Sequence, residues 1–192
     1  MPLNLFKGET LNLTRECIDL SEIMIGLGWD EVKQKRGLFY AKSAGIDCDL
    51  SAFLISNDKP LEIENVVYYA NLKHKSGAVE HRGDNLTGRT ERDAEQISVD
   101  FKRLPAIFNR IVFAVIIYDA DKKQQHFGMM QNAFIRVFDS KKEICRYSLS
   151  ENYDGKTAII FGDVTKSDDE WRFAAIGQAT NNDLSGLAWY YR

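Results

Sequence analysis

Short apolar runs rich in β-branched and aromatic residues recur along this chain, with polar turns between them. Such runs are typical of β-strands, because these side chains pack well on a pleated, half-buried surface. Ile97, Val99 and Phe101 also alternate with polar residues, which indicates a strand with one buried face. The predicted strands are Glu22–Leu27, Ile46–Ile55, Leu61–Tyr69, Gln96–Phe101, Ile111–Tyr118, Asn132–Phe138, Ile144–Leu149, Thr157–Phe161 and Glu170–Ile176.

Helical patterns are few by comparison. Arg103–Asn109 predicts a turn or two of helix, and Asn182–Tyr190 predicts a short closing helix. The run Ile111–Ile117 is apolar on both faces and suits a central strand, although a buried helix has the same pattern. Many strands with little helix predict a mainly β fold, an antiparallel two-sheet β-sandwich with one or two short helices. A β-barrel is the alternative.

A single domain over residues 1–192 is the simplest organisation for this composition. A chain of 192 residues that is 44% hydrophobic can bury a substantial core without disulfide staples. Neither a Pro-, Ser- or Gly-rich linker nor an internal repeat divides it. The net charge of -3 argues against a general nucleic-acid-binding protein, which normally carries a basic field.

The cysteines and the first residues indicate the compartment. Cys17, Cys48 and Cys145 contain no CxxC pair and are interpreted as reduced thiols of a cytosolic protein. Met1–Lys7 lacks the basic start and long apolar stretch of a secretory signal. The longest apolar run, Ile111–Tyr118, is too short to span a bilayer as a helix. We therefore expect a cytoplasmic protein.

Two aspartates stand close together in the predicted strand Ile46–Ile55. Asp47 and Asp49 point to the same face, roughly 7 Å apart, whereas Cys48 and Leu50 point to the core. Like charges at this separation repel, and aspartate is unfavourable in strands. A cation bound between the two carboxylates would replace this repulsion by attraction.

A second acidic segment, Gly83–Glu95, offers carboxylates, an amide, a hydroxyl and backbone carbonyl oxygens. Calcium takes about six to eight such hard oxygen ligands, whereas magnesium requires a more regular octahedron. The spacing is not that of an EF-hand, because Leu86 and Gly88 stand where that loop requires Asp or Asn. The segment therefore predicts a calcium site of another kind, and a solvated acidic turn is the alternative.

A series of short segments, in a fixed order along the chain, extends this pattern. They are Leu27–Asp30, Asp47–Phe53, Gly83–Gly88, Glu95–Asp100, Leu104–Pro105, Ile116–Ala120, Asn132–Val137 and Trp171–Gln178. Each is a weak signal alone, but the combination is specific. Together they resemble the TerD family of bacterial tellurite-resistance and stress proteins over nearly the whole chain, from about Leu5 onward.

The resemblance implies a calcium-binding β-sandwich that is associated with resistance to tellurite and other chemical stress and acts without catalysis. We therefore expect one or two Ca2+ ions, no catalytic residues and no other cofactor. The implied partners are other stress-operon proteins, including at the inner membrane surface, and no nucleic acid. The implied calcium ligands are Asp47, Asp49, Asp84, Asn85, Thr87, Gly88 (through its carbonyl), Asp93 and Glu95.

The chain departs from the family pattern directly after Thr87 and Gly88. Arg89 and Arg92 bring positive charge into the acidic segment, and Ala94 replaces one of the family's aspartates. The number of ions and their affinity therefore stay open.

Several other polar and aromatic residues are expected to be structural. His81 is interpreted as an exposed turn histidine, with a role as a donor behind the metal ligands as the alternative. Lys122 and Lys123 form a basic cluster typical of a solvated surface. Tyr68 and Tyr69 lie in an apolar run, so packing in the core is expected.

Three kinds of function remain compatible with these patterns. The first is a calcium-binding stress protein that acts through contacts with other proteins. The second is a calcium-dependent module that binds membrane surfaces, for which Arg89 and Arg92 would supply basic side chains beside the ion. The third, a metal-dependent hydrolase of phosphate esters, has the weakest support, because the sequence offers no convincing base or nucleophile.

Overall fold

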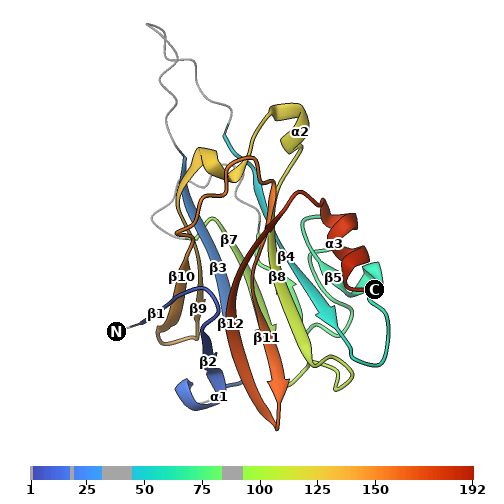
Figure 1. Ribbon diagram of the computed structural model, residues 1–192. Coiled ribbons are helices and arrows are strands. Elements are labelled where there is room, and N and C mark those ends of the chain that lie inside the picture. The colour runs from blue at the N-terminus through green and yellow to red at the C-terminus, as the bar shows by residue number, and fades with distance from the viewer. Residues whose placement is uncertain (1, 18–19, 32–44, 84–92) are drawn as a thin grey trace, which may run out of the picture.

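Two β-sheets pack face to face and form most of the molecule (Figure 1). The computed structural model describes residues 2–17, 20–31, 45–83 and 93–192. Within these residues, the first sheet has six strands in the order β1 (Leu3–Leu5), β10 (Glu143–Ser148), β9 (Met130–Phe138), β3 (Glu22–Glu31), β7 (Glu95–Asp100) and β6 (Val79–His81). The second has six in the order β2 (Thr10–Asn12), β12 (Glu170–Thr180), β11 (Ala158–Ser167), β8 (Arg110–Ile117), β4 (Cys48–Ile55) and β5 (Val66–Val67).

The strands pair in the antiparallel sense, apart from the edge pair β1 and β10, which is parallel. Strand β8 lies between β11 and β4, so the run Ile111–Ile117 is the central strand that its two apolar faces predict. Ile97 and Val99 of β7 are fully buried, as their alternation with polar residues predicts. The mainly β, antiparallel two-sheet sandwich predicted from the sequence is therefore confirmed.

The prediction of one strand over Leu61–Tyr69 is wrong for most of its length. A 3-10 turn, η1 (Ile63–Asn65), occupies its middle, and only Val66–Val67 pairs with β4. The turn is closed by a hydrogen bond that the Asn65 backbone N–H donates to the Glu62 carbonyl oxygen, at 2.9 Å. The short strands β1, β2 and β6 are not predicted by the sequence patterns, because three residues show too little alternation to be recognised.

Short helices lie at the ends of strands: α1 (Leu13–Glu16), α2 (Ala120–Lys123), η2 (Phe127–Met129) and α3 (Leu184–Tyr190). The predicted closing helix is α3, which begins where the Asp183 side chain accepts a hydrogen bond from the Gly186 N–H at 2.8 Å. The predicted helix Arg103–Asn109 is wrong; turns take its place after Asp100, whose carboxylate accepts from the Lys102 N–H. Within the described residues, no helix is long and apolar enough to cross a membrane.

The main core lies between the sheets and includes the predicted apolar row of β4, namely Cys48, Leu50, Ala52 and Leu54. Cys17 and Cys145 are buried in the same cluster, and all three cysteines are reduced thiols, as expected. Burial raises the pKa of the Cys17 thiol to about 11 and that of the Cys145 thiol to about 12. Neither of these two thiols is therefore ionised appreciably at neutral pH.

A second apolar cluster covers the outer face of the second sheet. Leu187 of α3 packs with Phe53, Val112 and Ile160, and Figure 1 shows α3 beside this sheet at the β4 and β5 side. The later part of β4 is thus buried on both faces. Its first residues extend past this cover, toward the end of the sandwich at which α2 follows β8 (Figure 1).

Candidate metal centre at the start of β4

The predicted calcium ligands divide between described and undescribed parts of the chain. Asp84, Asn85, Thr87 and Gly88 lie outside the described residues, as do Arg89 and Arg92. Asp47, Asp49, Asp93 and Glu95 are described. In the structure Asp47 and Asp49 lie at the start of β4, the Glu95 carboxylate contacts the backbone of the next residue, Leu50, and Asp93 pairs with Arg136 elsewhere.

Asp49 alternates along β4 with the core residues Cys48 and Leu50 and so points away from the core, and Asp47 directly precedes the strand. The Tyr118 N–H donates to the Asp47 carbonyl oxygen at 2.8 Å, and Asp49 pairs with Ile116, so β8 holds both positions in register. Asp49 is only 7% exposed. A carboxylate buried to this degree is costly unless a hydrogen bond or a cation compensates it.

Glu95 reaches this point from the first sheet. Its carboxylate accepts a hydrogen bond from the Leu50 N–H, and its side chain is 1% exposed. The Leu50 nitrogen belongs to the peptide bond that follows Asp49, so the Glu95 carboxylate lies beside the Asp49 backbone. Strands β7 and β4 from opposite sheets are joined at the candidate site itself.

His81 stands behind Glu95, and its interpretation as an exposed turn histidine is wrong. It is buried at the end of β6, with Nε2 at 3.4 Å from Glu95 Oε2. Its Nδ1 accepts a hydrogen bond from the Gly83 N–H at 3.3 Å, and its other ring nitrogen, Nε2, is the one near the carboxylate. The available signal is its two-residue spacing from Val79, which puts both side chains on the buried face of a strand.

Asp93 does not join the other acids. Its carboxylate accepts two hydrogen bonds from Arg136, at 2.7 Å from Nε and 2.9 Å from Nη2, and one from Gln96 at 3.0 Å. Its side chain is buried against Gly26, where any Cβ would clash with the Asp93 carboxylate. Strand β7 begins only at Glu95, so Asp93 lies outside the strand that carries Glu95.

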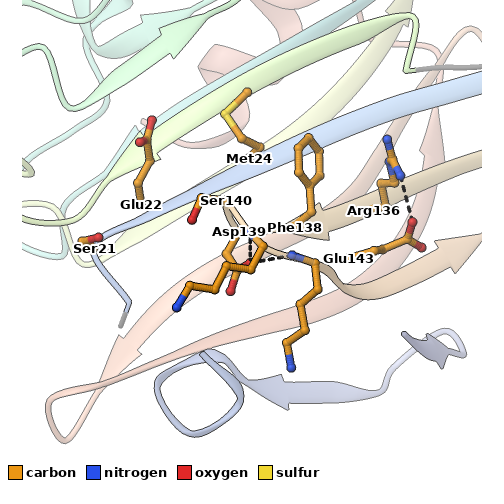
Figure 2. A pocket seen from close by; sticks show the side chains of 10 residues that line it. Ser21, Glu22, Met24, Arg136, Phe138, Asp139, Ser140 and Glu143 are labelled. Atoms are coloured by element: carbon orange, nitrogen blue, oxygen red, sulfur yellow. Dashed lines mark hydrogen bonds and ion pairs between the residues drawn. The ribbon is translucent and has the colours of Figure 1, made fainter. Parts of the chain in front are cut away.

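Arg136, the partner of Asp93, lines a separate hollow of about 590 Å³ on the outer face of the first sheet. Figure 2 shows Arg136 and Glu143 side by side on its wall, joined by a hydrogen bond of 2.9 Å. Asp139 accepts from the backbone N–H groups of Lys141 and Lys142 in the turn at the other end. The carboxylates and cations of this hollow thus largely bind one another, so the candidate site is the start of β4.

A lysine and two tyrosines complete the surroundings of Asp47 and Asp49. Lys123 Nζ lies 3.7 Å from Asp47 Oδ2 and 5.0 Å from the centre of the Tyr118 ring. Tyr69 packs edge-on against Tyr118, and its pKa is raised by burial and by the nearby Asp49 charge. Tyr69 is 46% exposed, so its expected place in the core is wrong.

The chemistry of these donors fits a hard cation. Carboxylate oxygens are preferred calcium ligands, and one cationic group, the Lys123 ammonium, lies 3.7 Å from Asp47 Oδ2. Among the described residues, no three His, Cys, Asp or Glu side chains form a group able to hold a metal ion. A calcium centre here would therefore need oxygen donors from residues 84–92 beside Asp47 and Asp49.

Comparison with known proteins gives the same family throughout. Residues 1–191 match the TerD domain. Stress response protein SCP2 of Bacillus subtilis (strain 168) is 43% identical over 188 residues, covering 95% of this chain and 94% of that protein. Tellurium resistance protein TerD of Serratia marcescens is 33% identical over 194 residues, covering 100% and 97%.

A solved structure supports the fold independently of the sequence. The crystal structure of a homologue of telluride resistance protein (TerD) from Streptomyces coelicolor A3(2) superposes with a TM-score of 0.67. It covers 88% of this chain and 96% of the other at 18% sequence identity. At that identity the likeness establishes the shared sandwich alone.

Proposed function

Because the chain belongs to the TerD family of tellurium-resistance and stress-response proteins, we propose that it serves in the stress response as a calcium-binding protein that acts through protein contacts, without catalysis. The proposed compartment is the cytoplasm, and the proposed partners are other stress-operon proteins. The observation that supports the calcium proposal is a pair of aspartates two residues apart at the start of β4, one of which, Asp47, has the Lys123 ammonium 3.7 Å from its Oδ2.

The electrostatics of this placement support a bound cation. Two carboxylates only two residues apart repel when they approach one another, and Asp49 is largely buried, so water screens it poorly. Calcium would add positive charge and take several oxygen ligands at once. The proposed ligands are Asp47, Asp49 and Glu95, joined by Asp84, Asn85, Thr87 and Gly88 outside the described residues. Asp93 could contribute only by giving up part of its hydrogen bonding to Arg136.

The buried thiols support a role without redox catalysis. A cysteine acts as a nucleophile or reductant through its thiolate. Burial raises the pKa of the Cys17 and Cys145 thiols, so little thiolate is present at neutral pH. Direct reaction of these thiols with an oxidising stress agent is therefore disfavoured.

Isothermal titration with CaCl2, after removal of metal by chelator, tests the proposal. Wild type should give a saturable isotherm, and the double variant Asp47→Asn/Asp49→Asn should lose it. Asp58→Asn is the matched control, because Asp58 is an exposed turn residue in the same part of the chain. Wild type without a calcium isotherm, or a double variant that binds as wild type does, contradicts the proposal.

A membrane-surface function is the second candidate, and one observation favours it. Tyr69 and Tyr118 are 46% and 43% exposed beside the proposed calcium site. Tyrosine is favoured at membrane interfaces, where its ring meets the apolar region and its hydroxyl meets water. Calcium-dependent co-sedimentation with phosphatidylserine vesicles, lost in Tyr69→Ser/Tyr118→Ser, would support this candidate; equal sedimentation with calcium and with chelator would oppose it.

A further inference from the structure

A glycine follows Asp154 in the exposed turn that leads into β11. Asp154 and Gly155 form the one Asp-Gly step in the sequence. The Lys156 N–H closes the turn by donating to the Tyr153 carbonyl oxygen at 3.2 Å. Gly155 has a φ of 67°, and open space lies where its Cβ would stand. Within the described residues its N–H donates no hydrogen bond, so the nitrogen next to the Asp154 carboxyl group is unhindered and unengaged.

The segment that precedes β9 approaches the Asp154 carboxylate from the other side. His126 Nδ1 lies 3.1 Å from Asp154 Oδ1. Gly128 of η2 makes this approach possible, because a Cβ there would stand 2.7 Å from the same oxygen and 2.9 Å from the Asp154 Cα. The Phe127 N–H also donates to the Lys156 carbonyl oxygen at 2.8 Å. The fold therefore holds the imidazole beside a carboxylate that is distant in the sequence.

The charged groups around this pair are engaged elsewhere. In the part of the chain that the structure describes, Asp154 is the one acidic residue that pairs with His126. Glu151, in the same loop, pairs with Lys7 at 2.8 Å. The two lysines of α2 pair with other aspartates. The Asp154 side chain is 71% exposed and that of His126 is 26% exposed, so water reaches the carboxylate.

We infer that Asp154–Gly155 is a site of spontaneous isoaspartate formation in which His126 acts as a general acid. The Gly155 nitrogen attacks the Asp154 carboxyl carbon, and a C–N bond forms. One carboxyl oxygen leaves as water, taking one proton from that nitrogen through solvent and one from the protonated His126 Nδ1.

Water is the only other reactant and completes the change. It adds to the succinimide ring, whose C–N bond to the former main-chain carbonyl carbon of Asp154 breaks. The main chain then runs through the Asp154 side chain, which is an isoaspartate. The protein thus carries a slow chemical modification at one defined turn of its fold, apart from the proposed calcium site.

Peptide mapping of the full-length protein, aged at neutral pH, tests the inference. Trypsin releases the peptide Tyr147–Lys156, and chromatography with mass spectrometry separates and identifies its isoaspartyl form. Ageing in heavy-oxygen water should place a heavy oxygen in the modified residue, because ring opening takes up water. Asp58 and Asp169 are exposed but are followed by Lys59 and Glu170, so they are internal controls and should remain unmodified.

Two variants test the role of the imidazole. His126→Gln removes the acid but keeps a polar side chain, and should slow modification of Asp154 about tenfold at neutral pH. The ratio of the wild-type rate to the variant rate should fall toward unity as the pH rises from about 5 to about 8, the range in which imidazole side chains lose their proton. Lys122→Gln removes an exposed charge away from the turn and should age as wild type does.

The same samples in urea, where the contact between His126 and Asp154 is lost, should react at equal rates. Native wild type that stays unmodified while the urea-treated protein reacts overturns the site, because the fold then protects the turn. Equal native rates for wild type and His126→Gln, or a ratio that does not change with pH, overturn the general-acid role. Equal modification at Asp58 or Asp169 overturns the specificity for Asp154. Melting curves verify that each variant is folded before it is aged.

Discussion

The Glu95 carboxylate accepts a hydrogen bond from the backbone N–H of Leu50, and so joins β7 of the first sheet to β4 of the second. The edge of β4 makes this bond necessary, because within the described residues β5 pairs with β4 only at Ala52 and Phe53. A buried backbone N–H without an acceptor is costly, and Glu95 supplies one from the opposite sheet. The same contact holds the start of β4, with Asp47 and Asp49, in place.

Replacement of Glu95 should therefore lower stability. Glu95→Ala leaves the Leu50 N–H without its acceptor and opens space in a buried corner, so we expect a loss of about 2 to 3 kcal/mol in the free energy of unfolding. Glu62→Ala, at an exposed position, is the control and should change it by less than about 0.5 kcal/mol. Denaturant unfolding measures both; equal midpoints for the two variants would refute the structural role of Glu95.

Asp93 should stabilise the fold through its ion pair with Arg136 rather than bind calcium. Asp93→Asn breaks a bidentate ion pair with Arg136, and because the Arg136 side chain is 24% exposed we expect a loss of about 2 kcal/mol rather than more. The calcium-induced rise in melting temperature should stay as large as in wild type. Loss of that rise in a folded Asp93→Asn protein would show instead that Asp93 binds the ion.

Sequence patterns predict much of the fold because its long strands alternate or are apolar throughout. They also place Asp49 on the side of β4 opposite the core residues Cys48 and Leu50, since a two-residue period fixes side-chain direction within a regular strand. No such period applies to Asp93, which the family resemblance suggests as a ligand and which lies before the first residue of β7, Glu95. The two-residue period thus predicts side-chain direction within a strand but not for the residues that precede it.

The sequence patterns do not predict contacts between distant segments of the chain. His81 lies on a three-residue strand and meets Glu95 only because β6 and β7 pair. Lys123 meets Asp47 only because β4 and β8 pair in a register that brings Cys48 opposite Ile117. Neither pairing leaves a local signature in the chain, so the sequence patterns assign both residues to a solvated surface.

The pH dependence of stability should report on His74. Its ring is buried, with Nδ1 accepting from the Ser76 N–H at 3.2 Å and Nε2 at 3.2 Å from Asn65 Oδ1. Burial lowers the pKa of His74 below its usual value, so the folded protein favours the neutral ring. The neutral His74 ring therefore contributes fully to the free energy of unfolding above the unfolded-state pKa. This contribution is lost as the pH falls toward the lower folded-state pKa.

The free energy of unfolding of wild type should thus fall more steeply than that of His74→Gln between about pH 7 and about pH 5. Urea titrations at a series of pH values measure the two curves. Parallel curves would contradict the assignment of this pH dependence to His74.

The thiols should behave as structural groups. Cys17 and Cys145 are buried with raised pKa values, so Ellman's reagent should react with them far more slowly in the native protein than in denaturant. Cys48 lies in the core row of β4, and Cys48→Ala should keep calcium binding. Fast native labelling of Cys17 or Cys145, or loss of calcium binding in a folded Cys48→Ala protein, would count against a structural role.

The melting temperature, measured with calcium and with chelator, tests the central claim most directly. Calcium at a hundredfold excess over its dissociation constant should stabilise wild type by about 2.7 kcal/mol. Asp49→Asn should lose most of this gain and, relieved of repulsion from Asp47, should melt slightly higher than wild type in chelator, whereas Asp58→Asn should behave as wild type. If calcium shifts neither wild type nor Asp49→Asn, or shifts both equally, the start of β4 is not a calcium site.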